Sequence, residues 1–400
     1  MRKIALLACM IAGCTTYRDM KVNQVPTGHF QLYTYPESLS TYRVETYDSD
    51  RFKEIYFTTH SNLNGEFSPQ TYSLNDPSHK ETHFVPKGGV AAIKSYFETL
   101  ERTFGKDKLL KVNLGSNFHS KASDAETAFY LNYLDYDIYS PGIGEFQTIK
   151  PGQAIYRLGK RASLLNAPTI LSNLYTLKDF KPYQVNSVDQ TIVLERNGVR
   201  IGFISAISPQ VTEDINKASL TGLYFEPILN NIMVQSKALR SQGAQIIVLL
   251  AQAKLDCSET LSKQLGLPRE KVNFEPGVSH FCQSPKDEFF NSLEKLPKNM
   301  VDLILTSGVD SKVANYIQKF PVSQIFSSGD YLGLVRLLYD NKLERVVLSE
   351  TKLFQPISLC HITFKETQDC YTGENLRNVE LTKPSLFGSA VKINPLPIRK

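Results

Sequence analysis

The 400-residue sequence has no tryptophan, only 7 histidines and no large excess of charge of either sign. Its 45 Lys and Arg residues nearly balance 40 Asp and Glu residues, which gives a formal net charge of +5 at pH 7. Proteins that bind nucleic acid electrostatically carry a strongly basic face. The composition therefore predicts no nucleic-acid partner.

Several catalytic and metal-binding motifs are also absent from the sequence. It contains no C-x-x-C, no G-x-S-x-G, no Walker P-loop, no H-E-x-x-H and no G-x-G-x-x-G after a strand. The sequence therefore gives no support for a zinc ribbon, a thioredoxin-like site, a serine-hydrolase nucleophile elbow, a phosphate-binding P-loop, a zinc metalloprotease helix or a dinucleotide-binding loop. A carboxylate pair for glycoside hydrolysis stays open, because such pairs follow no spacing rule, but nothing in the sequence favours it.

The first 14 residues predict a lipoprotein signal peptide. Met1-Arg2-Lys3 is a basic start, an apolar run follows to Ala12, and Ile11-Ala12-Gly13-Cys14 resembles a bacterial lipobox. Residues 1–13 would be removed and Cys14 would carry the acyl chains, including palmitate. The alternatives are an ordinary secretory signal and a first transmembrane helix, although the run is too short to span a bilayer comfortably.

Acylation of Cys14 predicts a membrane-tethered protein that folds in water. Several acyl chains hold a protein stably, since each buried methylene contributes about 0.8 kcal/mol. Thr15 follows Cys14, whereas an aspartate there is the usual inner-membrane retention signal of enteric bacteria. We therefore expect a bacterial envelope protein with an envelope protein partner, on the outer membrane rather than the inner one, with either face possible.

Four further cysteines predict disulfides in the exported chain. They are Cys257, Cys282, Cys360 and Cys370. An even number of cysteines in an exported protein favours full pairing. Among the three possible connectivities, we choose the pairs that are local in sequence, Cys257 with Cys282 and Cys360 with Cys370.

Apolar patterning divides the chain and predicts an α/β fold. Residues 14–52 are rich in tyrosine and predict a tether, with one strand near Phe30 to Tyr35. From Lys53 onward, short apolar runs alternate with amphipathic segments. Strands are predicted at 55–57, 109–114, 137–139, 191–194, 200–204, 245–251, 302–305, 323–326 and 332–339, and helices at 89–104, 124–134, 226–243 and 311–318.

Five short stretches lie at the ends of these predicted strands. They read THSNLNG at 59–65, VNLGS at 112–116, GIGEF at 142–146, VLLAQ at 248–252 and LTSGVD at 305–310. In order and context they resemble the motifs of the calcineurin-like metallophosphoesterase domain in the bacterial 5′-nucleotidase family. The usual forms there are N-D-x-H-G, G-D, G-N-H-E-F, a strand ending in S-H, and G-G-H-T-H.

The resemblance implies a four-layer αββα sandwich over residues 53–345. Three runs outside the motifs strengthen it, namely NGVRIGFI at 197–204, GAQIIVLL at 243–250 and YLGLVRL at 331–337. Family nucleotidases carry a large second domain that stacks the base between aromatic rings. Residues 346–400 are too few for that domain, so we expect a C-terminal extension in its place.

Nearly every position that matches a metal ligand of the family holds a different residue. Two-metal phosphoester hydrolysis needs carboxylates and imidazoles that hold two cations and generate hydroxide. Amides, hydroxyls and hydrogen atoms are poor ligands. The matched positions are Asn62, Asn64, Ser116, Ile143, Gly144, Gln252, Gly308 and Asp310, of which only Asp310 can coordinate well.

These replacements lead to a hypothesis of a pseudo-phosphoesterase, with no catalytic residue, metal or other cofactor, that serves in binding or assembly. The first alternative is a metal-dependent phosphohydrolase of the 5′-nucleotidase type, with Mn, Zn or Ca in a rearranged site made of His60, His119, Glu145 and Asp310. Without a metal role, His60 and His119 are expected to be ordinary solvated or capping side chains in loops. His79 and His83 are expected in a surface loop. The second alternative is a solute-binding lipoprotein.

Overall fold

The computed structural model describes residues 47–76, 81–119, 121–146, 152–214, 220–253, 255, 288–307, 313–325, 329–365, 370 and 380–396. The predicted signal peptide, Cys14 and the predicted strand at 30–35 lie outside these residues, as do Cys257 and Cys282. Among the helices of the described residues, none combines the length and the apolar character needed to cross a membrane.

The first of two large sheets is mixed. Its strands run in the order β15-β14-β1-β4-β5, and β16 also pairs with β14. Strand β1 is central because it pairs parallel with β4 and antiparallel with β14. The bounds are β1 Phe52–His60, β4 Leu109–Asn113, β5 Ile138–Tyr139, β14 Tyr331–Asp340, β15 Arg345–Val346 and β16 Lys352–Ser358.

The second large sheet runs in the order β12-β13-β11-β10-β8-β7. Strands β8, β10, β11 and β13 run parallel to one another, whereas the edge strands β7 and β12 pair antiparallel with β8 and β13. The β7–β8 turn holds Asn197 and Gly198 at φ 50° and 76°, as the predicted hairpin requires. The bounds are β7 Thr191–Arg196, β8 Val199–Ile207, β10 Ile246–Gln252, β11 Leu303–Ser307, β12 Val313–Ile317 and β13 Phe320–Gln324.

The two sheets pack face to face over a shared apolar core. Ile55 and Phe57 of β1 lie in this core with Phe203 of β8 and Val248 of β10, and all four are fully buried. Tyr56, between Ile55 and Phe57, belongs to a second core on the opposite face of the first sheet. This division follows from the alternation of side chains along a strand, and it buries both faces of β1.

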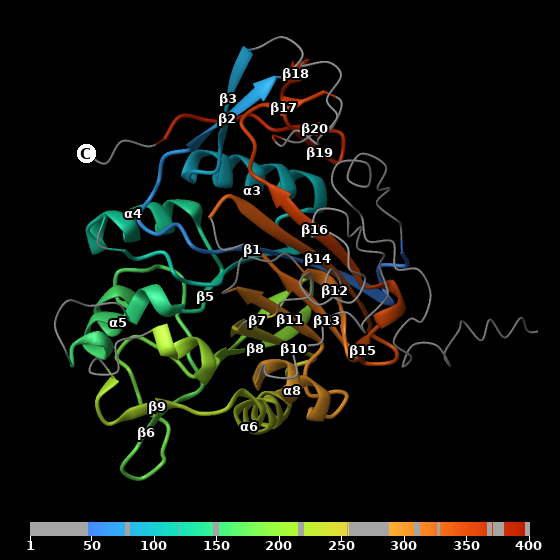
Figure 1. The fold of residues 1–400 in the computed structure, drawn as a ribbon. Helices are drawn as coiled ribbons and strands as arrows, with labels where there is room; N and C mark the ends of the chain where they lie inside the picture. The colour runs from blue at the N-terminus through green and yellow to red at the C-terminus, as the bar shows by residue number, and fades with distance from the viewer. Residues whose placement is uncertain are drawn as a thin grey trace, which may run out of the picture.

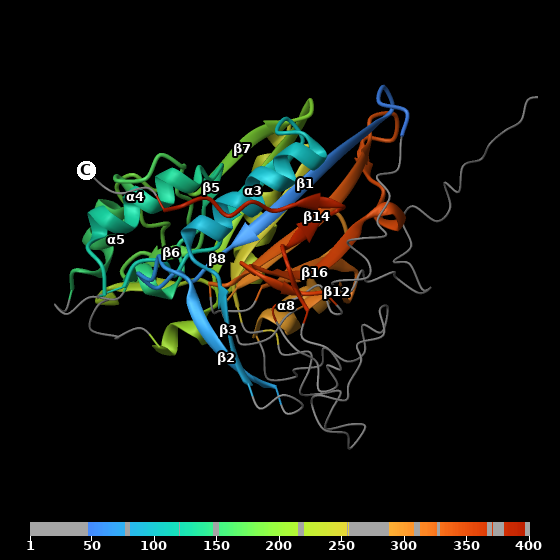
Figure 2. The same ribbon diagram turned by 90° about the horizontal axis from the view of Figure 1, so that it is seen from above.

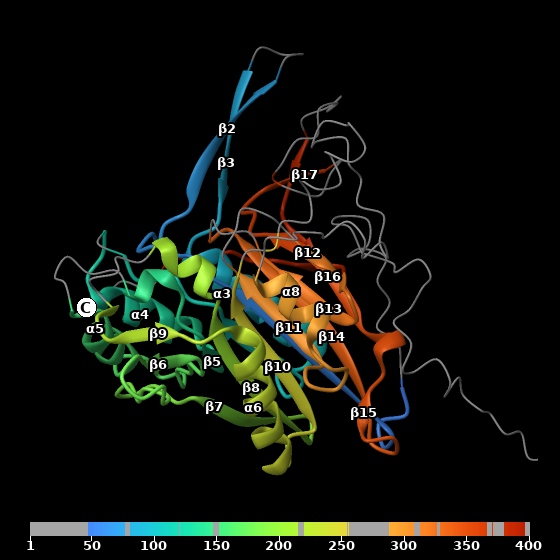
Figure 3. The same cartoon turned by 60° about the horizontal axis from the view of Figure 1, so that its bottom comes forward.

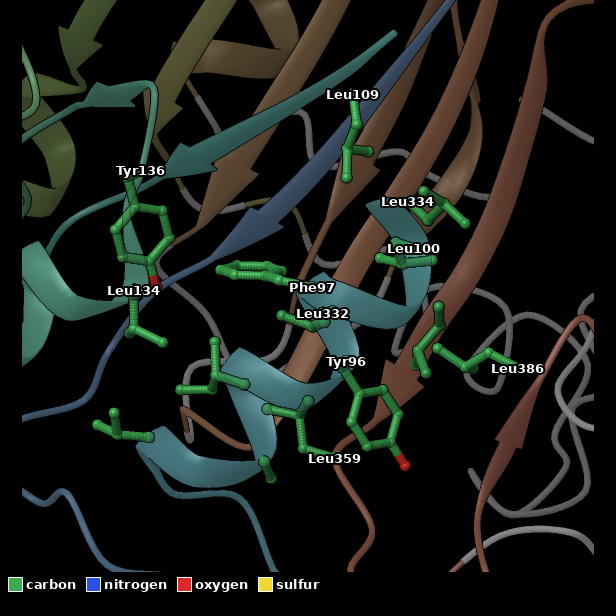
Figure 4. Close-up of a cluster of buried hydrophobic side chains, with 14 of the residues drawn as sticks. Tyr96, Phe97, Leu100, Leu109, Leu134, Tyr136, Leu332, Leu334, Leu359 and Leu386 are labelled. Carbon is green, nitrogen blue, oxygen red and sulfur yellow. The ribbon is translucent and has the colours of Figure 1, made fainter. Parts of the chain in front are cut away.

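Helices cover the two outer faces, which confirms the predicted four-layer αββα sandwich (Figures 1 and 2). Helices α3 (Val90–Phe104) and α4 (Asp124–Leu134) cover the first sheet, where Phe97 and Leu100 lie near Leu332 and Leu334 of β14 (Figure 4). Helices α6 (Ile228–Ser241) and α8 (Glu288–Lys295) cover the second sheet. The bounds of α4 agree with the predicted helix at 124–134.

Two predictions of local structure are wrong. Residues 313–317 form the edge strand β12 and not part of a helix at 311–318. The region of His79 and His83 is not a simple loop, because His83 lies in β3, which pairs with β2 in a long hairpin that projects from the body (Figure 3). His79 itself lies outside the described residues.

Smaller elements complete the fold. They are β2 Gln70–Asp76, β3 Glu81–Lys87, α5 Ala154–Ala162, β6 Leu174–Thr176, β9 Leu223–Phe225, β17 Thr363–Phe364, β18 Leu381–Thr382, β19 Ser385–Leu386, β20 Ser389–Ala390 and the 3-10 helices η1 Ile143–Phe146, η2 Pro209–Asp214 and η6 Leu348–Glu350. The predicted disulfide between Cys360 and Cys370 is confirmed, and it lies in the segment that follows β16.

Candidate functional site

The described parts of the five motif stretches, which for the fifth are residues 305–307, lie at one edge of the sandwich, called the motif edge below. Strands β1 and β4 run parallel in the first sheet, and β10 and β11 run parallel in the second. The carboxyl ends of parallel strands lie at the same edge of a sheet, which is where α/β proteins build their sites. Gln252 at the end of β10 joins the two sheets there, because its Nε2 donates to the Leu114 carbonyl at 2.6 Å.

The first motif forms a small network of amide and hydroxyl groups. Asn62 Nδ2 donates to Ser61 Oγ at 2.6 Å and to Ser307 Oγ at 3.0 Å, and the two serine hydroxyls lie 2.8 Å apart. Asn62 and Asn64 both have positive φ, 61° and 51°, a conformation that asparagine tolerates better than most residues. The amide of Asn62 is thus engaged with Ser61 and Ser307.

The second and third motifs pack tightly against each other. Ser116 is 9% exposed, and its Oγ accepts a long hydrogen bond from Gly144 N at 3.5 Å. A Cβ added at Gly144 would lie 3.0 Å from Ser116 Cα and 3.2 Å from the Phe118 carbonyl oxygen. Backbone atoms therefore occupy the space next to position 144, where the family places a histidine.

Glu145 is a fully satisfied buried carboxylate. Its Oε2 accepts from Gly142 N at 2.6 Å and from Ser116 N at 2.7 Å. Its Oε1 accepts from Asn117 N at 2.8 Å and from the Tyr139 hydroxyl at 2.7 Å. Burial beside this carboxylate raises the pKa of Tyr139 well above its ordinary value, which keeps the phenol protonated as a donor. Glu145 thus ties the second motif to the third.

His60 lies in the protein interior, so the expectation that it is a solvated or capping side chain in a loop is wrong. It is the last residue of β1 and has no exposed surface. Its Nε2 donates to the Gly329 carbonyl at 2.9 Å, so Nδ1 is the acceptor for the Tyr136 hydroxyl at 3.0 Å. Burial lowers the pKa of His60 to about 4, so the ring is neutral near pH 7.

Two other members of the rearranged metal site, Glu145 and His119, form hydrogen bonds with other described residues. His119 is partly exposed, and its Nδ1 accepts from Lys121 N at 3.3 Å. Gly308 and Asp310 lie outside the described residues, so their positions stay predictions. With both ring nitrogens of His60 and both oxygens of Glu145 occupied, the geometry does not support a cation held by these two residues.

Several residues that support the site carry no motif signal in the sequence. Arg161 of α5 is 2% exposed and donates to the Gly144 and Glu145 carbonyls at 3.2 Å and 2.8 Å. Its Nε also pairs with Asp124 at 3.0 Å. Asn117 Nδ2 donates to Asn113 Oδ1 at 2.7 Å. Through these hydrogen bonds, Arg161 and Asn117 support the loops that carry the second and third motifs. Only their burial distinguishes them from ordinary polar residues of the surface.

The described side chains do not fit a two-metal centre. Asn62, Ser116 and Gln252 are buried amides and a hydroxyl, and Ile143 and Gly144 offer no side-chain donor. Throughout the described part of the chain, no three or more His, Cys, Asp and Glu side chains gather in a way that could hold a metal ion. Cations in such centres require carboxylate or imidazole ligands.

No model of a known protein family matches this sequence. A curated relative, an apyrase of Aedes albopictus, is 20% identical over 261 residues, which cover 64% of this chain and 44% of the apyrase. The chain thus spans less than half the length of that relative.

Solved structures share the architecture. The calcineurin-like phosphoesterase YfkN of Bacillus subtilis is 15% identical with a TM-score of 0.54, over 77% of this chain and 91% of that one. The NAD nucleotidase of Haemophilus influenzae is 15% identical with a TM-score of 0.52, over 78% of this chain and 51% of that one. Together with the sandwich and its motif edge, these similarities show that the chain has the fold of 5′-nucleotidases and calcineurin-like phosphoesterases.

Proposed function

We propose that this protein uses a phosphoesterase fold without two-metal catalysis and serves as a binding or scaffold protein. One observation carries the proposal. Three of the described positions that match metal ligands, Asn62, Ser116 and Gln252, hold buried amides and a hydroxyl. These groups bond to neighbouring protein groups, as Gln252 does to Leu114 and Asn62 does to Ser307. Groups arranged in this way stabilise the junction between the sheets.

The proposal places the protein in the bacterial envelope, anchored through lipid on Cys14. The support for this comes from the basic, apolar and Gly13-Cys14 pattern at the start of the sequence. A protein tethered to a membrane can act by holding a partner there, without turnover. An envelope protein is the proposed partner.

The test is metal analysis of the purified mature protein together with a phosphatase screen. We expect less than about 0.1 equivalent of Mn, Zn or Ca per chain, and no release of phosphate from nucleotides or phenyl phosphates when these cations are added. Stoichiometric metal with turnover above the buffer rate would overturn the proposal.

A second candidate function is a metal-dependent phosphohydrolase of the 5′-nucleotidase type. The similarities to known proteins favour it over a scaffold, because the similar proteins are an apyrase, a nucleotidase and a phosphoesterase. It requires Asp310 and His119 as ligands, since His60 and Glu145 are engaged elsewhere.

Variants separate this candidate from the first. If the protein is a hydrolase, Asp310→Asn and His119→Ala should each lower bound metal and activity by at least about tenfold. The matched control is Asp179→Asn, which changes an exposed aspartate in another part of the chain. A wild-type activity that survives both substitutions would argue against a rearranged site at these residues.

A further inference from the structure

A cavity of about 350 Å³ lies at the opposite end of the sandwich from the candidate site. Its walls come from the residues just before β11, the start of β13, and β15 with the adjoining 3-10 helix η6. The candidate site lies where β10 and β11 end. Figures 1 and 3 show β15 on the far side of the molecule from α5, whose Arg161 supports the motif loops. The volume falls at the lower end of the range for small-molecule sites.

Three cationic side chains from separate segments line this cavity. Lys298 follows α8, Lys319 lies in the turn between β12 and β13, and Arg345 begins β15. The lining also includes one carboxylate, that of Asp302. Its charge is already compensated, because Oδ2 accepts from Arg240 Nη2 at 2.6 Å and from Ile247 N at 2.7 Å. Lys298 and Lys319 therefore contribute positive charge that Asp302 does not offset.

The remaining lining is largely apolar. Phe320 and Val346 are 1% and 4% exposed, and Pro321 and Leu348 lie beside them in the cavity wall. Lys319 Nζ lies 5.5 Å from the centroid of the Phe320 ring, which is itself almost fully buried. A cationic group next to an apolar wall complements a molecule that has an acidic group on an apolar body.

We propose that this cavity binds a small organic anion whose carboxylate or phosphate group pairs with Lys298 or Lys319 and whose aromatic or short acyl body packs against the apolar wall at Leu348. The site is separate from the motif edge and does not depend on the proposed function. It gives the chain a ligand-binding role whether or not the motif edge is catalytic.

Isothermal titration of the full mature protein at low ionic strength tests this site. The probes are phenylphosphonate, benzoate, phenol and inorganic phosphate, none of which contains a phosphoester bond that a hydrolase could cleave. We expect phenylphosphonate or benzoate to bind at least about tenfold more tightly than phenol and phosphate, and to bind more weakly as salt is added. If neither aromatic anion binds below about 10 mM, or if phenol binds equally well, the proposal is wrong.

Charge-reversal variants test whether the ligand binds in this cavity. Lys319→Glu and Lys298→Glu should each weaken binding of the aromatic anion by about tenfold. Lys342→Glu is the control, because it makes the same change of charge at an exposed position outside the lining. Thermal unfolding of each variant checks that the fold is intact. Equal weakening by Lys342→Glu would show that general charge, and not this cavity, determines binding.

Discussion

At the scale of single residues, two ionisable side chains of the motif edge are buried and hydrogen-bonded in the protein interior. His60 is held as a neutral ring between Tyr136 and the Gly329 carbonyl, and Glu145 is held as an acceptor for five donors. Burial disfavours the charged form of His60, and both oxygens of Glu145 have donors in the interior. Their contribution to stability should therefore be large and measurable.

His60 should make the protein less stable as the pH falls. Its pKa of about 4 in the folded state lies below the ordinary 6.5, so between these values the unfolded chain binds a proton that the folded chain does not. The contribution of His60 to the free energy of unfolding should fall by about 2 kcal/mol between pH 7.5 and pH 5, and this contribution should level off below pH 4. Urea unfolding at a series of pH values measures this.

The control compares two histidine variants. His60→Gln should be less stable than the wild type at pH 7.5 but should lose much of the pH dependence, because the titrating group is gone. His119→Gln changes a partly exposed ring and should keep the pH dependence of the wild type. An unchanged slope in His60→Gln would show that other groups cause the acid sensitivity.

Replacing Glu145 with glutamine should destabilise the fold even though the size is conserved. The amide turns one acceptor into a donor that faces backbone N–H groups of Ser116 and Gly142 or of Asn117. We expect a loss of about 2–3 kcal/mol in the free energy of unfolding, measured by urea denaturation. Glu195→Gln on the exposed side of β7 should cost less than about 0.5 kcal/mol, and a similar cost for both would contradict this role of Glu145.

At the scale of elements, the sequence predicts the buried strands and the amphipathic helices well. The predicted strand at 109–114 and the helix at 124–134 correspond to β4 and α4. The strand is a short apolar run, and in the structure the helix has a local cap, where Ser123 accepts from Glu126 N. The failure at 311–318 has a physical cause. Val313, Ala314 and Ile317 fit a helical spacing, but a short apolar run also fits an edge strand, and pairing with β13 decides between the two.

The segment after β16 depends on its disulfide. Cys360 and Cys370 are both buried, and the Tyr96 hydroxyl of α3 donates to the Cys360 carbonyl at 3.1 Å. Replacing both cysteines with serine should lower the free energy of unfolding by about 2–3 kcal/mol, because a closed loop of this length restricts the unfolded chain. Thermal unfolding with and without reductant measures the effect. A double variant as stable as the oxidised wild type would contradict the prediction.

At the scale of the whole molecule, the resemblance predicts the sandwich, whereas periodicity alone predicts only α/β layering. The site is predicted less completely. The sequence places Asn62, Ser116 and Gln252 at one edge, but it does not reveal that Arg161 and Asn117 support them, because these contacts join segments distant in sequence. The boundary at residue 346 stays a prediction, although β16 beyond it belongs to the first sheet.

Strand β16 should be essential to the whole fold and not a removable extension. Phe354 has no exposed surface and packs in the core between the first sheet and α3. Phe354→Ala should cost about 3–5 kcal/mol in the free energy of unfolding. Leu381→Ala, at a position that is 44% exposed, should cost less than about 0.5 kcal/mol. Equal costs in urea denaturation would show that the strand is peripheral.

The close contact of Gly144 with the backbone at Ser116 and Phe118 limits which residues can be introduced there. Any residue larger than glycine at position 144 requires these main-chain atoms to yield by a few tenths of an ångström. Under the proposed function, installing the family's histidine would therefore carry a steric penalty before any gain of hydrolysis.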